Sequence, residues 1–137
     1  MKTILFAALA AAATLAPLSA EVKAKPFVVK TVTVVTVSGK IPPGFPAFKK
    51  QDIVNLKISP KELTGPQKID LPIKSKSITS DVYYKGTSVL NFTEATVYKN
   101  ATTKKVTRVD LTVFAPVKVL GNVTAPGQVT YSFVPKR

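Results

Sequence analysis

The sequence predicts an all-β protein, an antiparallel sandwich of seven or eight short strands that follows a leader segment. Three observations predict this class. Apolar side chains alternate with polar ones at a period of two, which buries one face of a strand and leaves the other in water. Turn-forming residues separate the alternating segments at short intervals. After residue 20, no apolar stripe of helical period extends beyond one turn.

The first 20 residues have the pattern of a cleavable secretion signal. Lys2 supplies the positive start, Ile4 to Ala16 is an almost continuous apolar run, and Pro17 precedes a small-residue cleavage site. The apolar run is shorter than the roughly 20 residues that a transmembrane helix needs. We therefore expect residues 1–20 to be removed and residues 21–137 to form one domain without a transmembrane segment. The expected location is secreted or periplasmic.

The first predicted strand, at residues 27–38, is the longest β-prone segment. Its apolar phase changes near Val34 and Val35, so a β-bulge there would restore one apolar face. The alternative is a central strand that is buried on both faces. The other alternating segments predict strands at residues 52–58, 68–74, 77–84, 88–98, 105–114, 117–120 and 128–134. Pro72 has no N–H donor, which predicts that its strand lies at a sheet edge.

One connection is expected to contain a single helical turn. Ser59 is a capping residue, Pro60 suits the first helical position, and Glu62 follows three residues after the cap. Gly65 is expected to end this turn. Short strands joined in this way favour an immunoglobulin-like or fibronectin-III-like sandwich, with a small β-barrel as the alternative.

The composition removes most of the chemistry open to a small exported protein. The chain has no histidine and no cysteine. It therefore lacks the usual base of nucleophilic triads and the usual ligands of zinc, copper and iron. Its 7 Asp and Glu residues show no spacing typical of a carboxylate pair or a calcium loop. We predict a protein that is not an enzyme and that uses no metal and no cofactor.

The chain is strongly basic, with 20 Lys and Arg residues and a net charge of +13. This charge favours anionic partners, although isolated lysines also serve solubility alone. Because the basic residues form no arginine-rich segment and no known motif, sequence-specific nucleic-acid binding is not expected. The main basic cluster consists of Lys104, Lys105 and Arg108, and we treat it as a candidate binding surface.

A second candidate surface is the proline-rich segment at residues 39–50. Its candidate binding side chains are apolar or basic: Ile41, Phe45, Phe48, Lys49 and Lys50. Such a loop would either insert into an anionic membrane or a partner's pocket, or fold back and close one end of the domain.

Two further features concern glycans. Asn91, Asn100 and Asn122 lie in N-glycosylation sequons, which would be used only in a eukaryotic secretory pathway. Tyr83 and Tyr84 present one ring to each face of a strand. The outward ring would stack either on a sugar or on a cross-strand neighbour.

These features predict a non-catalytic β-sandwich that binds a protein, a glycan or an anionic surface, or that associates structurally. One alternative is an inhibitor or toxin-like effector that presents residues 41–48. A second alternative is a carbohydrate-active enzyme that uses two carboxylates. The sequence predicts neither the ligand nor the oligomeric state.

Overall fold

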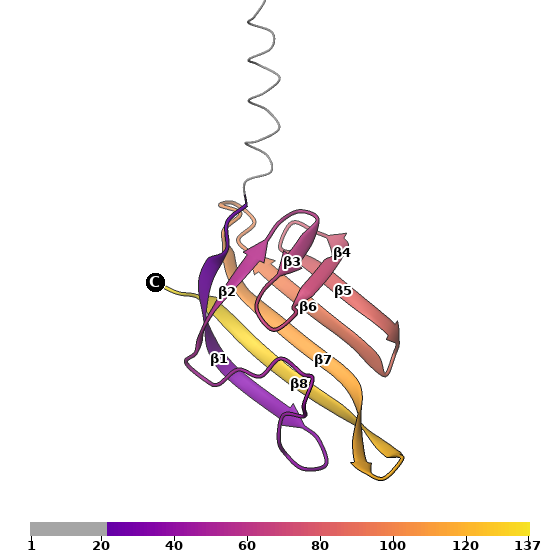
Figure 1. The fold of residues 1–137 in the computed structure, drawn as a ribbon. Helices are drawn as coiled ribbons and strands as arrows, with labels where there is room; N and C mark the ends of the chain where they lie inside the picture. The colour runs from indigo at the N-terminus through magenta and orange to yellow at the C-terminus, as the bar shows by residue number, and fades with distance from the viewer. Residues whose placement is uncertain (1–21) are drawn as a thin grey trace, which may run out of the picture.

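The computed structural model describes residues 22–137 and shows eight antiparallel strands in one closed sheet (Figure 1). In chain order the strands are β1 (Lys25–Val35), β2 (Ile53–Ile58), β3 (Glu62–Thr64), β4 (Asp70–Lys76), β5 (Ser80–Ser88), β6 (Asn91–Lys99), β7 (Val106–Leu120) and β8 (Val123–Pro135). Each strand pairs with the next one along the chain, and β8 pairs with β1. The segment predicted to be a signal peptide lies outside the described residues.

The all-β antiparallel class is confirmed, whereas the expected sandwich is not. A sandwich has two separate sheets, but in this structure hydrogen-bonded neighbours continue around a barrel without a break. The period-two pattern predicts that one face of each strand is buried. It does not distinguish two stacked sheets from one curved sheet, because both bury alternate residues. In the described part of the chain, no helix is long and apolar enough to cross a membrane.

The segment at residues 59–62 reverses the chain between β2 and β3 and does not form a helical turn. The Ser59 N–H donates to the Glu62 carbonyl at 2.9 Å, and Ser59 Oγ accepts the Glu62 N–H at 3.0 Å. The prediction of a helical turn is therefore wrong. The bonds of Ser59 close a tight turn instead, and the chain then pairs Leu63 with Ile58 as the first step of a hairpin.

The β-bulge of β1 lies earlier than predicted. The register shifts between Val29 and Thr31, where Lys30 is exposed. Val29 is buried before the bulge, and Val34 packs against the core after it. The bulge thus restores the apolar face, as expected, but it lies at Lys30 and not near Val34 and Val35.

Two prolines lie in strands without ending them. The prediction that Pro72 marks an edge strand is wrong, because β4 lies between β3 and β5 in the closed sheet. Pro72 pairs with Glu62 of β3, and β4 pairs with β5 only from Ile73 onward, so the missing donor breaks no bond to β5. Pro116 lies directly opposite Pro126, and β7 continues through it as one strand where two were predicted. Opposed prolines fit a pair of an antiparallel ladder in which neither residue bonds to the other.

The interior of the barrel is apolar and aromatic. In β8, alternate residues Val129, Tyr131 and Phe133 point inward and have no exposed surface. Tyr83 of β5 and Leu56 of β2 are also fully buried. Eight strands enclose a space that side chains nearly fill. A ligand site is therefore expected at an end of the barrel.

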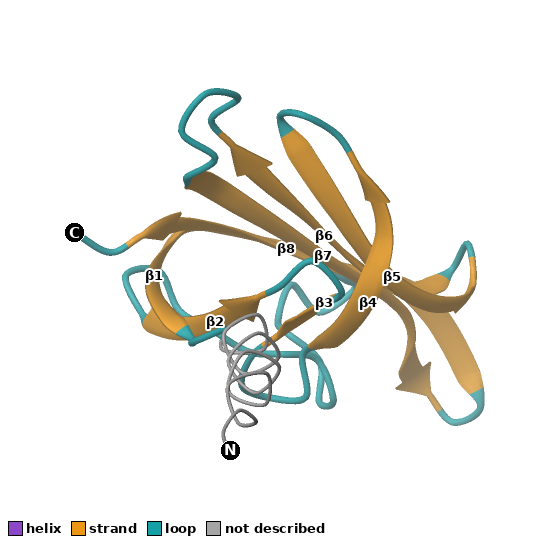
Figure 2. Ribbon diagram, turned by 90° about the horizontal axis from the view of Figure 1, so that it is seen from above, coloured by secondary structure: helices purple, strands orange, loops and turns teal. Residues whose placement is uncertain are grey.

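The two ends of the barrel differ. At one end, which we call the rim end, β1 begins, β8 ends and the β6–β7 loop (residues 100–105) lies; Figure 2 views the molecule from this side. At the other end, the arm end, residues 115–127 of the β7–β8 hairpin extend past the barrel (Figure 1). We call this extension the arm.

Candidate functional site

An open hollow of about 630 Å³ lies at the rim end. Its apolar lining comes from the segment before β1, from the starts of β1 and β7, from β2 and from the end of β8: Val22, Pro26, Phe27, Leu56, Ile58, Val106 and Pro135. Phe27 and Leu56 also belong to the buried core, so the floor of the hollow is continuous with the barrel interior. The volume is in the range of pockets that hold small molecules.

Five exposed lysines surround this apolar lining, and we call them the lysine rim: Lys23, Lys25, Lys104, Lys105 and Lys136. Among the residues that the structure describes, no aspartate or glutamate lines the hollow. Five like charges beside an apolar surface concentrate positive potential at the opening. The hollow therefore suits a molecule that has both an apolar part and an anionic group.

Closure of the barrel brings the start of β1 and the end of β8 together at the rim. Phe27 of β1 pairs with Pro135 of β8, and the Lys136 N–H donates to the Pro26 carbonyl at 3.0 Å. Lys25 of β1 and Lys136, which directly follows β8, are far apart in the sequence and thus lie at neighbouring strand ends. Because these residues are not neighbours in the sequence, three of the five rim lysines were not predicted as site residues: Lys23, Lys25 and Lys136.

Asn100 fixes the β6–β7 loop, which carries the other two rim lysines. Its Oδ1 accepts the N–H groups of Thr102 at 2.8 Å and Thr103 at 2.9 Å. The Asn100 N–H donates to the Lys105 carbonyl, and the Lys104 N–H donates to the Asn100 carbonyl, both at 2.9 Å. Lys104 has a φ of 64°, a left-handed conformation that costs a non-glycine residue about 1 kcal/mol. The loop therefore holds Lys104 and Lys105 in a defined turn at the rim.

The predicted cluster of Lys104, Lys105 and Arg108 is brought together only in part. Lys104 and Lys105 line the hollow, but Arg108 does not. Val109 points inward, so its neighbour Arg108 points outward from the wall. The Arg108 guanidinium lies 4.3 Å from the centre of the Tyr98 ring, and its Nε lies 3.2 Å from the Asp110 carboxylate.

Phe48 of the β1–β2 loop (residues 36–52) is packed into the barrel. It is 5 % exposed, and its ring meets those of Tyr131 and Phe133 edge-on at centroid distances of 5.2 and 5.9 Å. The Phe48 N–H donates to Tyr131 Oη at 3.2 Å, and this hydroxyl donates to the Pro46 carbonyl. Burial raises the pKa of Tyr131, so its hydroxyl stays a donor.

The rest of this loop follows Phe48 onto the barrel. Ile41 and Phe45 are half-buried against the core, whereas Lys49 and Lys50 are exposed. The side-chain amide of Gln67 brackets Ala47 by accepting its N–H at 2.8 Å and donating to its carbonyl at 3.0 Å. The loop thus folds back and closes the domain, which is one of its two predicted roles.

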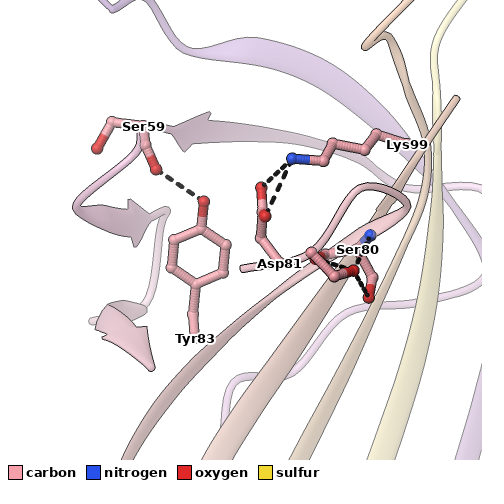
Figure 3. A network of polar contacts seen from close by, with 6 residues as sticks. Ser59, Ser80, Asp81, Tyr83 and Lys99 are labelled. Carbon is pink, nitrogen blue, oxygen red and sulfur yellow. Dashed lines mark hydrogen bonds and ion pairs between the residues drawn. The ribbon is translucent and has the colours of Figure 1, made fainter. Parts of the chain in front are cut away.

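A polar network lies inside the wall toward the rim end (Figure 3). Lys99 Nζ contacts both carboxylate oxygens of Asp81, at 3.0 and 3.1 Å, and Tyr83 Oη donates to the Ser59 carbonyl at 2.7 Å. Burial, and next the negative charge of Asp81, raise the pKa of Tyr83 to about 12. A phenol with this pKa is neither an acid nor a base near neutral pH. The contacts of the network link the turn at Ser59 to β5, and β5 to β6.

The carboxylates with described partners are engaged in local contacts. Asp81 pairs with Lys99, Asp110 pairs with Arg108, and Asp52 accepts the Lys49 N–H at 2.8 Å. Within residues 22–137, no group of three or more His, Cys, Asp or Glu residues is placed to hold a metal ion.

The features predicted to concern glycans lie at the surface. Asn91, Asn100 and Asn122 are exposed, and Asn100 is next to the lysine rim. Tyr84 stacks on Phe92 of the neighbouring strand at a centroid distance of 5.7 Å, and Lys74 Nζ lies 4.5 Å from the centre of the Tyr84 ring. The outward ring of Tyr84 therefore stacks on a cross-strand neighbour, which is the second of the two roles predicted for it.

The rim end combines an apolar hollow, five lysines and, within residues 22–137, no lining carboxylate. Comparisons with known protein families, with curated proteins and with solved structures gave no match to this chain.

Proposed function

We propose that this protein is an exported, non-catalytic binding protein that holds an anionic amphiphile at its rim end. The ligand class is a hydrocarbon chain with a carboxylate or phosphate group. The observation that carries this proposal is the lysine rim around an apolar hollow of about 630 Å³. The hydrocarbon would lie against Phe27, Leu56 and Ile58, and the anionic group would lie among the lysines.

The two parts of the ligand have different roles. Transfer of a hydrocarbon chain from water into an apolar site contributes about 0.8 kcal/mol per methylene group. One exposed lysine in contact with an anion contributes only about 0.2–1 kcal/mol. The chain would therefore supply most of the affinity, and the lysines would set orientation, selectivity and rate of association.

Export and the lack of catalysis belong to the same proposal. The leader pattern of residues 1–20 supports a secreted or periplasmic location. The chain has no histidine, and Asp81, the buried carboxylate, is paired with Lys99. An inhibitor-like role for residues 41–48 would need exposed phenyl rings, whereas Phe48 is 5 % exposed. Binding at the rim end is therefore favoured over both alternatives.

Calorimetric titration of the purified protein with dodecyl phosphate and dodecanoate tests the proposal. We expect one site for each ligand. Dodecanol and inorganic phosphate, which each lack one part, are expected to bind at least roughly tenfold more weakly. Equal binding of dodecanol would contradict a role for the lysine rim, and equal binding of inorganic phosphate would contradict a role for the hollow.

A matched pair of variants separates the lysine rim from total charge. The rim variant combines Lys104→Asn, Lys105→Gln and Lys136→Gln, with asparagine at 104 because it tolerates a positive φ. The control variant combines Lys30→Gln, Lys57→Gln and Lys76→Gln, three exposed lysines outside the hollow. We expect weaker dodecyl phosphate binding by the rim variant and unchanged binding by the control. An equal loss of dodecyl phosphate affinity in both variants would mean that only the net charge matters and would reject the proposed site.

A further inference from the structure

The arm end carries most of the exposed large apolar side chains of the described residues. Nine such side chains are exposed, and seven of them lie toward this end: Val35, Val37, Val89, Leu90, Val119, Leu120 and Val123. Val89 is 82 % exposed in the β5–β6 turn, and Leu120 is 79 % exposed at the tip of the arm. Both hairpins point toward the same end of the barrel in Figure 1. The other two, Ile53 and Ile78, lie in β2 and in the β4–β5 turn.

The arm is a two-stranded extension of the barrel wall. β7 pairs with β6 only up to Phe114, and β8 pairs with β1 only from Gln128. Residues 115–127 therefore pair only with each other, over about 20 Å at the usual rise of a strand. Gly121, with a φ of 58°, begins the two-residue turn at the tip.

The base of the arm is tightly packed, and its edges are poor templates for another strand. A Cβ atom at buried Gly127 would lie 2.5 Å from Val117 Cγ2, so only glycine allows this close contact. Pro116 and Pro126 are directly opposed. Because prolines have no N–H group, both outer edges of the arm lack a donor at this level. The arm is therefore suited to contacts through its tip rather than to addition of a further strand.

All charges in the stretches immediately around these apolar side chains are positive, whereas Asp52, at the end of the β1–β2 loop, lies beside Val29 of β1. Residues 35–50, 85–91 and 115–127 contain five lysines and no acidic residue: Lys40, Lys49, Lys50, Lys85 and Lys118. Apolar side chains flanked by lysines match an anionic lipid surface, where the apolar groups enter the headgroup boundary and the lysines meet the lipid charge. A second copy of this chain would instead bring two sets of lysines together, which is electrostatically unfavourable.

We propose that the arm end docks on an anionic lipid bilayer, with the tips around Val89 and Leu120 inserted at the headgroup boundary. Lys85 and Lys118 contact the lipid headgroups in this arrangement. The rim end faces away from the bilayer and stays open to solvent. This docking does not depend on ligand binding in the hollow, because the two surfaces share no residue.

A single tryptophan reports insertion directly, because the chain contains none. Leu120→Trp places the reporter at the arm tip, and Ile78→Trp places a matched reporter at a 66 % exposed apolar position outside the arm end. The probes are vesicles of phosphatidylglycerol and phosphatidylcholine in equal parts, and vesicles of phosphatidylcholine alone. We expect the Leu120→Trp emission to shift to the blue and to resist aqueous quenching with anionic vesicles only, while Ile78→Trp stays unchanged. Equal responses of both reporters, or no response at Leu120→Trp, would overturn the proposal.

Vesicle co-sedimentation of serine variants gives an independent reading. Val89→Ser with Leu120→Ser removes two arm-end apolar side chains, and Ile53→Ser with Ile78→Ser removes two exposed ones elsewhere. We expect the arm-end pair to weaken partitioning roughly tenfold or more, and the control pair to leave it unchanged. A stable dimer in sedimentation velocity without vesicles, lost in the arm-end pair alone, would show that a second copy covers this surface and would overturn the proposal. Intact vesicle binding alongside failed dodecyl phosphate binding would reject the proposed function and not this one.

Discussion

The two ends of the barrel differ in how their apolar interior is covered. Toward the arm end, the ring of Phe48 meets Tyr131 and Phe133, and the β1–β2 loop is bonded around it. Toward the rim end, the wall carries the Asp81–Lys99 pair and opens into a hollow of about 630 Å³. One end is filled by aromatic packing, and the other leaves apolar surface accessible.

The lengths of the strands explain why the β1–β2 loop is needed. β2 has 6 residues and pairs with β1 only over Lys25 to Val28. Beyond that point, Val29 bonds to the loop, donating to the Asp52 carbonyl at 3.0 Å and accepting the Gln51 N–H at 2.9 Å. The loop takes the place of a longer β2 and carries Phe48 into the interior. One end is thus closed by a loop that carries an aromatic ring, whereas the rim end leaves apolar surface accessible.

The largest effect is expected from Phe48→Ala. Removal of a buried phenyl ring from the closed end is expected to lower the free energy of unfolding by about 3–5 kcal/mol. Phe45→Ala is the matched control in the same loop, because Phe45 is only half-buried, and about 1 kcal/mol is expected. Urea unfolding of both variants measures the difference. Similar losses would contradict insertion of Phe48 into the barrel.

A smaller effect is expected from Asp81→Asn. This change leaves the Lys99 ammonium without its partner, at a side chain that is 19 % exposed, and a loss of about 2 kcal/mol is expected. Asp110→Asn breaks the more exposed pair with Arg108 and is expected to cost less than about 1 kcal/mol. Urea unfolding measures the loss in both variants. A larger loss for Asp110→Asn than for Asp81→Asn would contradict a stabilising role of the buried Asp81–Lys99 pair.

Tyr83→Phe is expected to cost about 1 kcal/mol at neutral pH, because the hydrogen bond to the Ser59 carbonyl is lost. The folded-state pKa of Tyr83 is about 12, above its ordinary value of 10.0. As pH rises, the unfolded state therefore loses this proton first, so the contribution of Tyr83 is complete below pH 10 and is lost between pH 10 and 12. Unfolding of the parent and of Tyr83→Phe across this range is expected to show a shallower alkaline loss in the variant. If stability fell with pH equally steeply in the parent and in Tyr83→Phe, a group other than Tyr83 would be responsible for the alkaline loss.

The smallest effect on stability is expected from Lys104→Gly. Glycine relieves the positive φ, so stability is expected to stay the same or rise by less than about 1 kcal/mol. Lys105→Gly, at a neighbouring residue without a positive φ, is expected to lower stability by roughly 0.5–1 kcal/mol. Thermal unfolding compares the two. A larger loss for Lys104→Gly would mean that the lysine side chain itself supports the loop.

Local pattern predicted much of the wall. The alternation of Val109, Leu111 and Val113 placed these residues on one face, and all three are buried. The same reasoning missed β3, because three residues are too few to show a period of two. It also did not predict closure of the barrel, because β1 and β8 are the first and last strands of the described residues and their pairing depends on the curvature of the whole sheet.

The candidate site shows the same limit. Lys104 and Lys105 are adjacent in sequence and were predicted together, whereas Lys23, Lys25 and Lys136 join them only through closure of the barrel. For the β1–β2 loop, the composition allowed either insertion into a partner or membrane or folding back onto the domain. The contact of Phe48 with Tyr131, which is distant in the sequence, shows that the loop folds back. Sequence thus predicts which faces are apolar better than it predicts which distant segments meet.

Titration of the protein with monomeric dodecyl phosphate, followed through assigned methyl resonances, tests the central claim most directly. The account predicts shifts at the floor of the hollow, on Leu56, Ile58 and Val106, with the arm-tip methyls of Leu120 unchanged. Shifts confined to the arm or to the outer wall, with Leu56 and Ile58 unchanged at saturation, would contradict a binding site at the rim end.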